Sequence, residues 1–310
     1  MEESEMSKGQ GTECPEISVV IASVNGPDYV DACLKSLRGQ TFKGPAEVIV
    51  ADCCGDGVTE LIRRDYPEVT LLSFGSRKTI PELRAIGMKN ARGKIIALTE
   101  DHCVADPNWF EGMYRAHRTY HGAIGGAVEN DPSIKGAVDW SVYFCEYSKY
   151  LNPVPAGEVS DIPGNNTSYR REFLDYLGGA LESGLWENFL NAKLQEHGVK
   201  LFSDPSIVVY HRKCFGFRYF LSQRYHYARS FAGMRTKGVS LWRRLLFAGF
   251  SPLLPALLIG RIGWRVLTKR RHLGRFFQAL PFLAVFTLSW GVGEFVGYLF
   301  GAGESLLKVE

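Results

Sequence analysis

The sequence has few features that would cross-link it covalently or bind it to nucleic acid. Its seven cysteines are odd in number and scattered, without a C-x-x-C pair. A disulfide framework or structural zinc site is therefore not expected, and a reducing compartment is favoured. Lys and Arg total 36 against 33 Asp and Glu. This small surplus argues against a dedicated nucleic-acid-binding protein unless the charge is clustered.

The first residues have hardly any apolar side chains and lack the basic-then-apolar order of a secretory signal. Residues 1–16 hold five Glu and one Lys, so we expect a disordered lead over this stretch. The first apolar run is also not followed by a Gly-rich phosphate loop with a Lys, since residues 22–26 read Ala-Ser-Val-Asn-Gly. This argues against a nucleotidyltransferase, which would share a doubly wound sheet and acidic metal ligands.

Short β-branched runs alternate with helical patterns over the first third of the chain. The runs expected to be buried strands are 17–22, 47–51, 69–74 and 94–98, and the helical patterns between them are 29–37, 58–65 and 80–91. Beyond residue 109 the pattern is less regular, with a further helix expected at 185–198 and a last strand at 207–210. The alternation predicts a doubly wound, mostly parallel α/β sheet, with its binding crevice at the carboxyl ends of the strands.

The C-terminal quarter contains two long apolar segments, 245–262 and 276–300, with basic residues on both sides of the first. The second is long enough to cross a bilayer, which takes about 20 residues. Because both flanks of the first are basic, two crossings would violate the positive-inside rule. The first also contains Pro252 and Pro255. We therefore expect it to be re-entrant or to lie along the cytoplasmic interface, and the second to span; a buried helical hairpin is the alternative.

The strongest chemical signal is Glu100-Asp101-His102, directly after a buried strand. Adjacent carboxylates repel unless a cation or a proton lies between them. The triplet therefore favours a hard divalent cation, Mg²⁺ or Mn²⁺, and His102 shifts the preference toward Mn²⁺. A solvated acidic turn without a metal is the alternative.

At this point the chain resembles the family-2 inverting nucleotide-sugar glycosyltransferases, which have a type-A glycosyltransferase fold. Residues 17–117 carry the clearest resemblance, and a weaker one continues to about residue 235. Asp52 stands where the family contacts the base of the nucleotide, before a Gly-containing turn. Arg84 with Gly87 resembles the family's Arg-Asn-x-Gly helix, with Ala85 in place of the Asn. The triplet at residues 100–102 takes the family's Asp-x-Asp position, with a His as its last residue.

Further segments complete what the resemblance implies. Residues 163–171 match the segment that supports the donor sugar, and residues 223–227 partly match the Gln-Arg-x-Arg-Trp motif of processive synthases. The second Arg and the Trp are missing there, which argues against a processive polymerase, and attraction to anionic lipid is the alternative role for these arginines. The nucleotide- and donor-binding residues implied are Ser23, Asp52, Arg84, Glu100, Asn165 and Arg224. The implied metal ligands are Asp101, His102 and His211, the last of these with a purely structural role as its alternative.

The expected catalytic base comes from residues 185–188. Aligned on Lys193-Leu194, these residues resemble the family's Glu-Asp motif, and Glu187 takes the place of the base. An inverting transfer needs a carboxylate to deprotonate the acceptor hydroxyl. A shift of the alignment by one residue would put Asn188 at this position, and Asn188 cannot act as a base. Glu182 is the reserve candidate. The alternative for Glu187 is a charged residue on an exposed helical face without a catalytic role.

The sequence thus predicts a membrane-associated inverting glycosyltransferase with a divalent metal, Mn²⁺ or Mg²⁺. We expect a lead over 1–16, a catalytic domain over 17–235 and a membrane-associated region over 236–310. The expected donor is a nucleotide sugar, with a UDP-sugar favoured, and the expected acceptor is a hydroxyl of a lipid-linked saccharide or glycolipid. Because nucleotide sugars are cytosolic, the catalytic domain should face the cytoplasm. A polyprenyl-phosphate sugar synthase and a degenerate membrane-anchored nucleotide-sugar-binding protein are the alternatives.

Overall fold

The computed structural model describes residues 14–236 and 238–309. Residues 1–13 of the expected disordered lead lie outside the described residues. Internal contacts divide the chain into two compact units, Met1–Asp131 with Tyr150–Arg212, and Pro132–Lys149 with Lys213–Glu310. The functional boundaries expected at residues 16/17 and 235/236 stay predictions.

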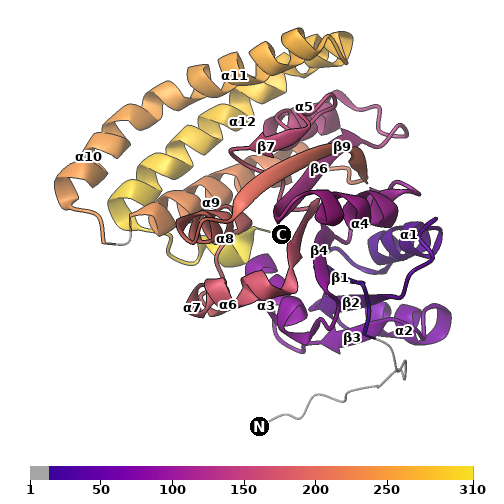
Figure 1. Cartoon of the computed structure of the whole chain (residues 1–310). Coiled ribbons are helices and arrows are strands. Elements are labelled where there is room, and N and C mark those ends of the chain that lie inside the picture. Colours follow the sequence, from indigo (N-terminus) through magenta and orange to yellow (C-terminus); the bar gives the residue numbers. More distant parts are fainter. Residues whose placement is uncertain (1–13, 237, 310) are drawn as a thin grey trace. The chain divides into compact units, whose positions relative to one another are not determined.

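The first unit is built on one mixed sheet, in the strand order β3-β2-β1-β4-β8-β6-β9-β5, with β7 beside β9 (Figure 1). The strands are β1 (Ile17–Ser23), β2 (Ala46–Asp52), β3 (Thr70–Ser73), β4 (Ile95–Glu100), β5 (Cys103–Ala105), β6 (Gly122–Asn130), β7 (Gly157–Val159), β8 (Thr167–Arg170) and β9 (Lys200–His211). Strands β1 to β4 pair in parallel, whereas β8 is antiparallel to both β4 and β6. The α/β fold class is confirmed, and beyond β4 the sheet is mixed.

The helices of the first unit follow the expected alternation with strands. They are α1 (Pro27–Arg38), α2 (Asp56–Asp65), α3 (Ile80–Asn90), α4 (Trp109–Thr119), α6 (Leu174–Leu177), α7 (Gly179–Glu182) and α8 (Glu187–Glu196), with a 3-10 turn at Arg171–Phe173. Thr79 and Glu82 form a reciprocal capping box at the start of α3, which satisfies two backbone N–H groups that would otherwise lack partners. This cap fixes where α3 begins, and so fixes the placement of Arg84 one turn later.

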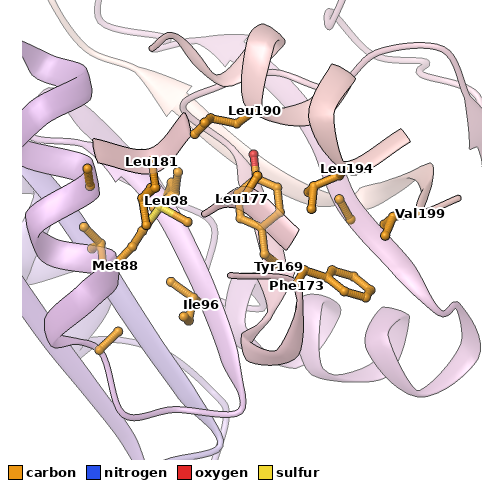
Figure 2. Close-up of a cluster of buried hydrophobic side chains, with 14 of the residues drawn as sticks. Met88, Ile96, Leu98, Tyr169, Phe173, Leu177, Leu181, Leu190, Leu194 and Val199 are labelled. Atoms are coloured by element: carbon orange, nitrogen blue, oxygen red, sulfur yellow. The ribbon is translucent and has the colours of Figure 1, made fainter. Parts of the chain in front are cut away.

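One apolar cluster joins the sheet to α3 and α8 (Figure 2). Met88 of α3, Leu98 of β4 and Leu194 of α8 are fully buried in it. Tyr169 of β8 adds its ring to the cluster and donates its hydroxyl to Asn191 of α8 at 2.9 Å. Burial of such side chains stabilises by roughly 1.5–3 kcal/mol each. Leu190 in the first turn of α8 also belongs to the cluster, which therefore packs that turn against α3, β4 and β8.

Strand β6 is an element that the sequence pattern did not reveal. The Gly125-Gly126 pair interrupts the apolar run of this strand, so the sequence pattern there is typical of an irregular segment. A Cβ on Gly126 would collide with the Ile207 carbonyl of β9 and with the side chain of Asn166. The glycine is therefore required by the close approach of neighbouring segments.

The second unit is helical. It contains α5 (Ala137–Tyr147), α9 (Phe217–Arg235), α10 (Leu241–Phe250), α11 (Leu254–Lys269) and α12 (Leu273–Phe300), with 3-10 turns at Ser251–Leu253 and Ser305–Lys308. Two stretches of the described residues are long and apolar enough to cross a membrane, Leu241–Lys269 and Leu273–Phe300. Helix α12 also has a buried face, because its Gly293 and Gly297 lie against the α9 backbone at Tyr225 and Arg229.

Candidate active site

The carboxyl ends of β1 and β2 are joined by a buried aspartate. The Ser23 hydroxyl donates to Asp52 Oδ1 at 2.6 Å, and the backbone N–H groups of Cys54 and Gly55 donate to Oδ2 at 3.1 and 3.3 Å. Burial raises the pKa of Asp52 above its ordinary value, outweighing these hydrogen bonds, which lower it. Asp52 therefore fixes the turn after β2, and the predicted contact of Ser23 and Asp52 with a nucleotide stays a prediction.

Asp101, the middle residue of the acidic triplet, ties the end of β4 to the end of β1. Its Oδ2 accepts the backbone N–H groups of Val24 and Asn25 at 2.8 Å each, and its Oδ1 accepts the Asn25 amide at 2.7 Å. Burial alone would raise the pKa of Asp101, but hydrogen bonds from His102, Asn25 and Val24 lower it. Both carboxylate oxygens are thus engaged within the protein. The predicted role of Asp101 in metal binding stays a prediction.

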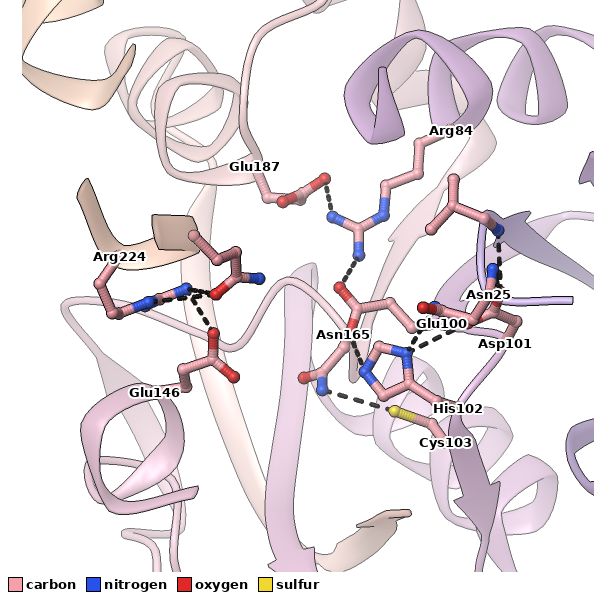
Figure 3. Close-up of polar contacts among 12 residues, drawn as sticks. Asn25, Arg84, Glu100, Asp101, His102, Cys103, Glu146, Asn165, Glu187 and Arg224 are labelled. Carbon is pink, nitrogen blue, oxygen red and sulfur yellow. Dashed lines mark hydrogen bonds and ion pairs between the residues drawn. The ribbon is translucent and has the colours of Figure 1, made fainter. Parts of the chain in front are cut away.

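Arg84 links two carboxylates from different elements (Figure 3). Its guanidinium contacts Glu100 Oε1 of β4 at 2.7 Å and, through its other terminal nitrogen, Glu187 of α8. The side chains of Arg84 and Glu187 are only 3% and 5% exposed. Burial would raise the pKa of Glu100, but the hydrogen bond from His102 and the charges of His102 and Arg84 hold it well below its usual range. The site therefore contains a network of ion pairs that is largely shielded from solvent.

Glu187, unlike the reserve candidate Glu182 and the neighbouring Asn188, lies in this buried network of ion pairs. Glu182 is 69% exposed and pairs with Lys89 at the surface, and Asn188 is exposed. The exposed helical face offered as the alternative for Glu187 is wrong, because that residue is buried at the first position of α8. A Cβ on Gly164 would meet the Glu187 carboxylate, so the segment predicted to support the donor sugar lies against the predicted base.

Next to Arg84 lies a group of side chains whose donor atoms could hold a metal ion. One ligand atom from each of Glu100, His102 and Cys103 lies within 4.8 Å of the others. The rings of His102 and His211 meet edge to face with centroids 5.0 Å apart. A His nitrogen beside a Glu oxygen suits Mn²⁺ better than Mg²⁺, whose ligands are almost all oxygens. The residues present thus fit the metal that the sequence predicts.

Cys103 was not predicted from the sequence, because nothing distinguishes a lone cysteine in a short apolar strand. Burial and the charge of Glu100 raise the pKa of the Cys103 thiol well above its usual range. The Asn165 amide donates to its sulfur at 3.5 Å. Within the described residues, Asn165 Oδ1 is buried without a hydrogen-bond partner. Asn165, predicted to bind the donor, is therefore placed beside the candidate metal ligands.

Asn130 is a second residue of this region that the sequence reasoning missed. It ends β6 opposite His211 of β9 and is 7% exposed. Neither its Oδ1 nor its Nδ2 has a hydrogen-bond partner within 14–236 and 238–309. Its place at the carboxyl end of a strand is the signal that would have found it, but that strand was not recognised.

Arg224 belongs to the second unit and is buried there. Its guanidinium pairs with Glu146 of α5 at 2.6 Å and lies over the rings of Phe220, Tyr227 and Trp290. Because it is 2% exposed, Arg224 does not lie on a surface that lipid could reach. Its predicted contact with the donor stays a prediction.

The fold and these strand ends define the class of protein. A doubly wound sheet with buried acidic and basic side chains and candidate metal ligands at its carboxyl edge is the arrangement of nucleotide-dependent α/β enzymes. Residues 18–178 match the family described as glycosyl transferase family 2, which is more than half of the 310-residue chain. The protein belongs to glycosyl transferase family 2 and has the type-A glycosyltransferase fold.

Individual relatives are more distant. Glycosyltransferase AglE of Haloferax volcanii is 28% identical over 121 residues, which is 37% of this chain and 40% of AglE. The chain thus matches well under half of that curated relative. The solved mannosyltransferase PcManGT from Pyrobaculum calidifontis, in complex with GDP-Man and Mn²⁺, aligns with a TM-score of 0.57 and 15% identity over 94% of this chain and 90% of PcManGT. At this identity the likeness concerns the fold.

Proposed function

We propose that this glycosyltransferase moves a sugar from a nucleoside-diphosphate donor to a hydroxyl group of a lipid-linked saccharide or glycolipid, with inversion at the anomeric carbon. The observation that carries the proposal is the buried network of ion pairs formed by Glu187, Arg84, Glu100 and His102. It puts a carboxylate, a cation for phosphate and candidate metal ligands side by side at the edge of the sheet. An inverting transfer requires these three groups within reach of one donor molecule.

In this proposal Glu187 takes the proton from the acceptor hydroxyl as that oxygen attacks the anomeric carbon. Arg84 is the cation that binds the donor diphosphate, since guanidinium groups recognise phosphate oxygens through paired N–H bonds. In the structure Arg84 is engaged by Glu187 and Glu100. Donor binding would therefore draw Arg84 toward phosphate and leave the Glu187 carboxylate more available as a base.

Glu100, His102 and Cys103 would hold a divalent metal, with His211 beside them. When bound, such an ion neutralises the charge that develops on the departing nucleoside diphosphate. Mn²⁺ is supported by the ligand types and by the Mn²⁺ found with GDP-Man in PcManGT. That structure contains a guanine nucleotide, so UDP- and GDP-sugars are both tested as donors below.

We further propose that the second unit attaches the enzyme to a membrane, with the first unit on the cytoplasmic side. Large apolar side chains of α10 and α11 are exposed, among them Trp242 at 73% and Trp264 at 71%. Exposed Arg243, Arg261 and Arg270 accompany them, as in helices that lie in an anionic membrane interface. These features support the interfacial placement predicted for the first apolar segment. An acceptor held in the same membrane would then be delivered directly to the enzyme.

Binding of the donor is tested by thermal unfolding of the detergent-solubilised protein. UDP, GDP, dTDP and CMP would each be added with and without Mn²⁺, because a ligand that binds only the folded state raises the unfolding temperature. We expect one diphosphate to stabilise the wild type in the presence of Mn²⁺, and His102→Ala to lose the Mn²⁺-dependent part. If no nucleotide shifts a well-folded sample, the proposed function is wrong and a degenerate binding module replaces it.

The role of Glu187 is tested by sugar transfer from the donor so identified to lipid extracts as acceptor. Glu187→Gln keeps the size of the side chain but removes the base, and we expect the turnover rate to fall about 10²- to 10⁴-fold. Glu182→Gln is the matched control and should keep the wild-type rate. A polyprenyl-phosphate acceptor already carries an anionic oxygen, so a nearly unchanged rate in Glu187→Gln would identify a polyprenyl-phosphate sugar synthase instead.

A further inference from the structure

A row of polar side chains crosses three neighbouring strands at the carboxyl edge of the sheet. Asn130 of β6 is the register partner of His211 of β9, and His211 is the register partner of Cys103 of β5. Register partners on adjacent strands point to the same face of a sheet, about 4.8 Å apart. Asn165 donates to Cys103, and the His211 ring contacts that of His102. Asn130 therefore lies on the same face as the candidate metal ligands.

Asn130 and Asn165 carry three polar atoms that no described residue satisfies. These are Oδ1 and Nδ2 of Asn130 and Oδ1 of Asn165. Both side chains are more than nine-tenths buried. A buried polar atom without a partner destabilises the folded protein, and most such groups in native structures are hydrogen-bonded. An unsatisfied pair of this kind is therefore expected where a ligand supplies the missing partners.

Asn166, the neighbour of Asn165, shows what a structural asparagine looks like in this fold. It is fully buried, and its Oδ1 accepts the Trp109 indole N–H at 2.7 Å. Its Nδ2 donates to the carbonyls of Ala127 and Ile207 at 2.8 and 3.0 Å. Both polar atoms of the Asn166 side chain are thus engaged, Oδ1 by α4 and Nδ2 by β6 and β9. Asn130 lacks all such contacts among the described residues, although it lies in the same sheet.

We propose that Asn130 binds hydroxyl groups of the transferred sugar and contributes to sugar selectivity. The inference rests on the proposed function, since it assigns one face of the same donor site. A primary amide offers one acceptor and two donor N–H groups, so Oδ1 and Nδ2 can engage two neighbouring hydroxyls of one sugar ring. Asn165, whose Nδ2 donates to Cys103, provides a further acceptor with its Oδ1. The amides carry no charge, which suits a neutral sugar better than the diphosphate.

The test compares Asn130→Ala with Asn166→Ala, first without ligand. Because the Asn130 side chain has no hydrogen-bond partner among the described residues, we expect the thermal unfolding temperature of Asn130→Ala to equal or exceed that of the wild type. Asn166→Ala strands the Trp109 N–H and two carbonyls and should unfold at a clearly lower temperature. A comparable fall in Asn130→Ala would show that the residue is structural and would overturn the inference.

The second arm measures binding by calorimetry with Mn²⁺, using UDP, GDP, UDP-N-acetylglucosamine, UDP-glucose and GDP-mannose as probes. We expect Asn130→Ala to bind the matching diphosphate with unchanged affinity, but to lose about tenfold or more in affinity for the nucleotide sugar, as expected for lost hydrogen bonds. Equal losses for both ligands, or no loss for either, would overturn the inference while leaving the proposed donor site intact. A wild type that binds no nucleotide would instead overturn the proposed function on which it rests.

Discussion

Replacing Arg84 with Met tests whether the buried network of ion pairs organises this site. The side chain lies between Glu100 and Glu187 at 3% exposure, so its removal leaves two carboxylates without their shared cation. Breaking a buried ion pair by removing one partner costs about 3–5 kcal/mol. Since each kcal/mol corresponds to about 1.5 °C in a protein of 310 residues, we expect the unfolding temperature to fall by about 5 °C or more.

Three further variants make the assay specific. Lys89→Met removes a cation from the same helix, but its pair with Glu182 is 47% and 69% exposed, so we expect a cost of about 0–1 kcal/mol. Glu187→Gln leaves Arg84 paired with Glu100, and the Gln carbonyl still accepts a hydrogen bond, so its cost should be about 1 kcal/mol. The double variant Arg84→Met with Glu187→Gln should be more stable than Arg84→Met alone, because one stranded charge is gone.

Thermal unfolding of the four variants at pH 7, in the same detergent and without nucleotide, gives the comparison. If Arg84→Met unfolds at the temperature of Lys89→Met, the ion pairs of Arg84 with Glu100 and Glu187 do not form a buried ionic unit. If the double variant shows no recovery relative to Arg84→Met, Glu187 and Arg84 are not coupled. Either result would refute the reasoning that places the predicted base in contact with the predicted phosphate-binding residue.

Other consequences can be checked on the same protein. Burial lowers the pKa of His117 from 6.5 to about 3, with contributions from Arg170 and His121. As the pH falls from 7 to 5, the unfolded chain therefore gains a proton that the folded chain does not, and the free energy of unfolding should fall by about 2 kcal/mol. Measured by chemical denaturation, this fall should be absent in His117→Gln and present in His197→Gln, whose substituted side chain is exposed. Asp101→Ala should lose about 1–3 kcal/mol in a thermal melt without any metal, and full stability would contradict the conclusion that Asp101 ties the end of β4 to the end of β1. Trp242→Ser with Phe250→Ser should weaken flotation with anionic vesicles, and unchanged flotation would contradict attachment through α10.

The local sequence determined much of the first unit. Buried strands separated by amphipathic helices specify an α/β sheet because a run of β-branched residues is stable only when both of its faces are covered. The strand ends, and with them Asp52 and the triplet at 100–102, follow from that alternation, since parallel strands present their carboxyl ends at one edge. The two apolar segments near the C-terminus were equally readable, because length and hydropathy are local properties. Strand β6 could not be predicted, because Gly126 is required by the close approach of Ile207 in β9 and of Asn166, and Gly125 by that of Ile162.

Only the tertiary structure decided which partners each polar residue contacts. Asp101 and His102 are neighbours in sequence, yet one holds the backbone after β1 and the other contacts Glu100 and lies against His211. Glu187, 103 positions beyond Arg84 in the sequence, meets it because the apolar cluster under α8 brings the start of that helix to the sheet edge. Asn130 and Asn166 are the same residue type in the same sheet, and only their neighbours distinguish an unsatisfied amide from a structural one. Such distinctions depend on which partners fill each hydrogen bond, and partners distant along the chain are brought together only by packing.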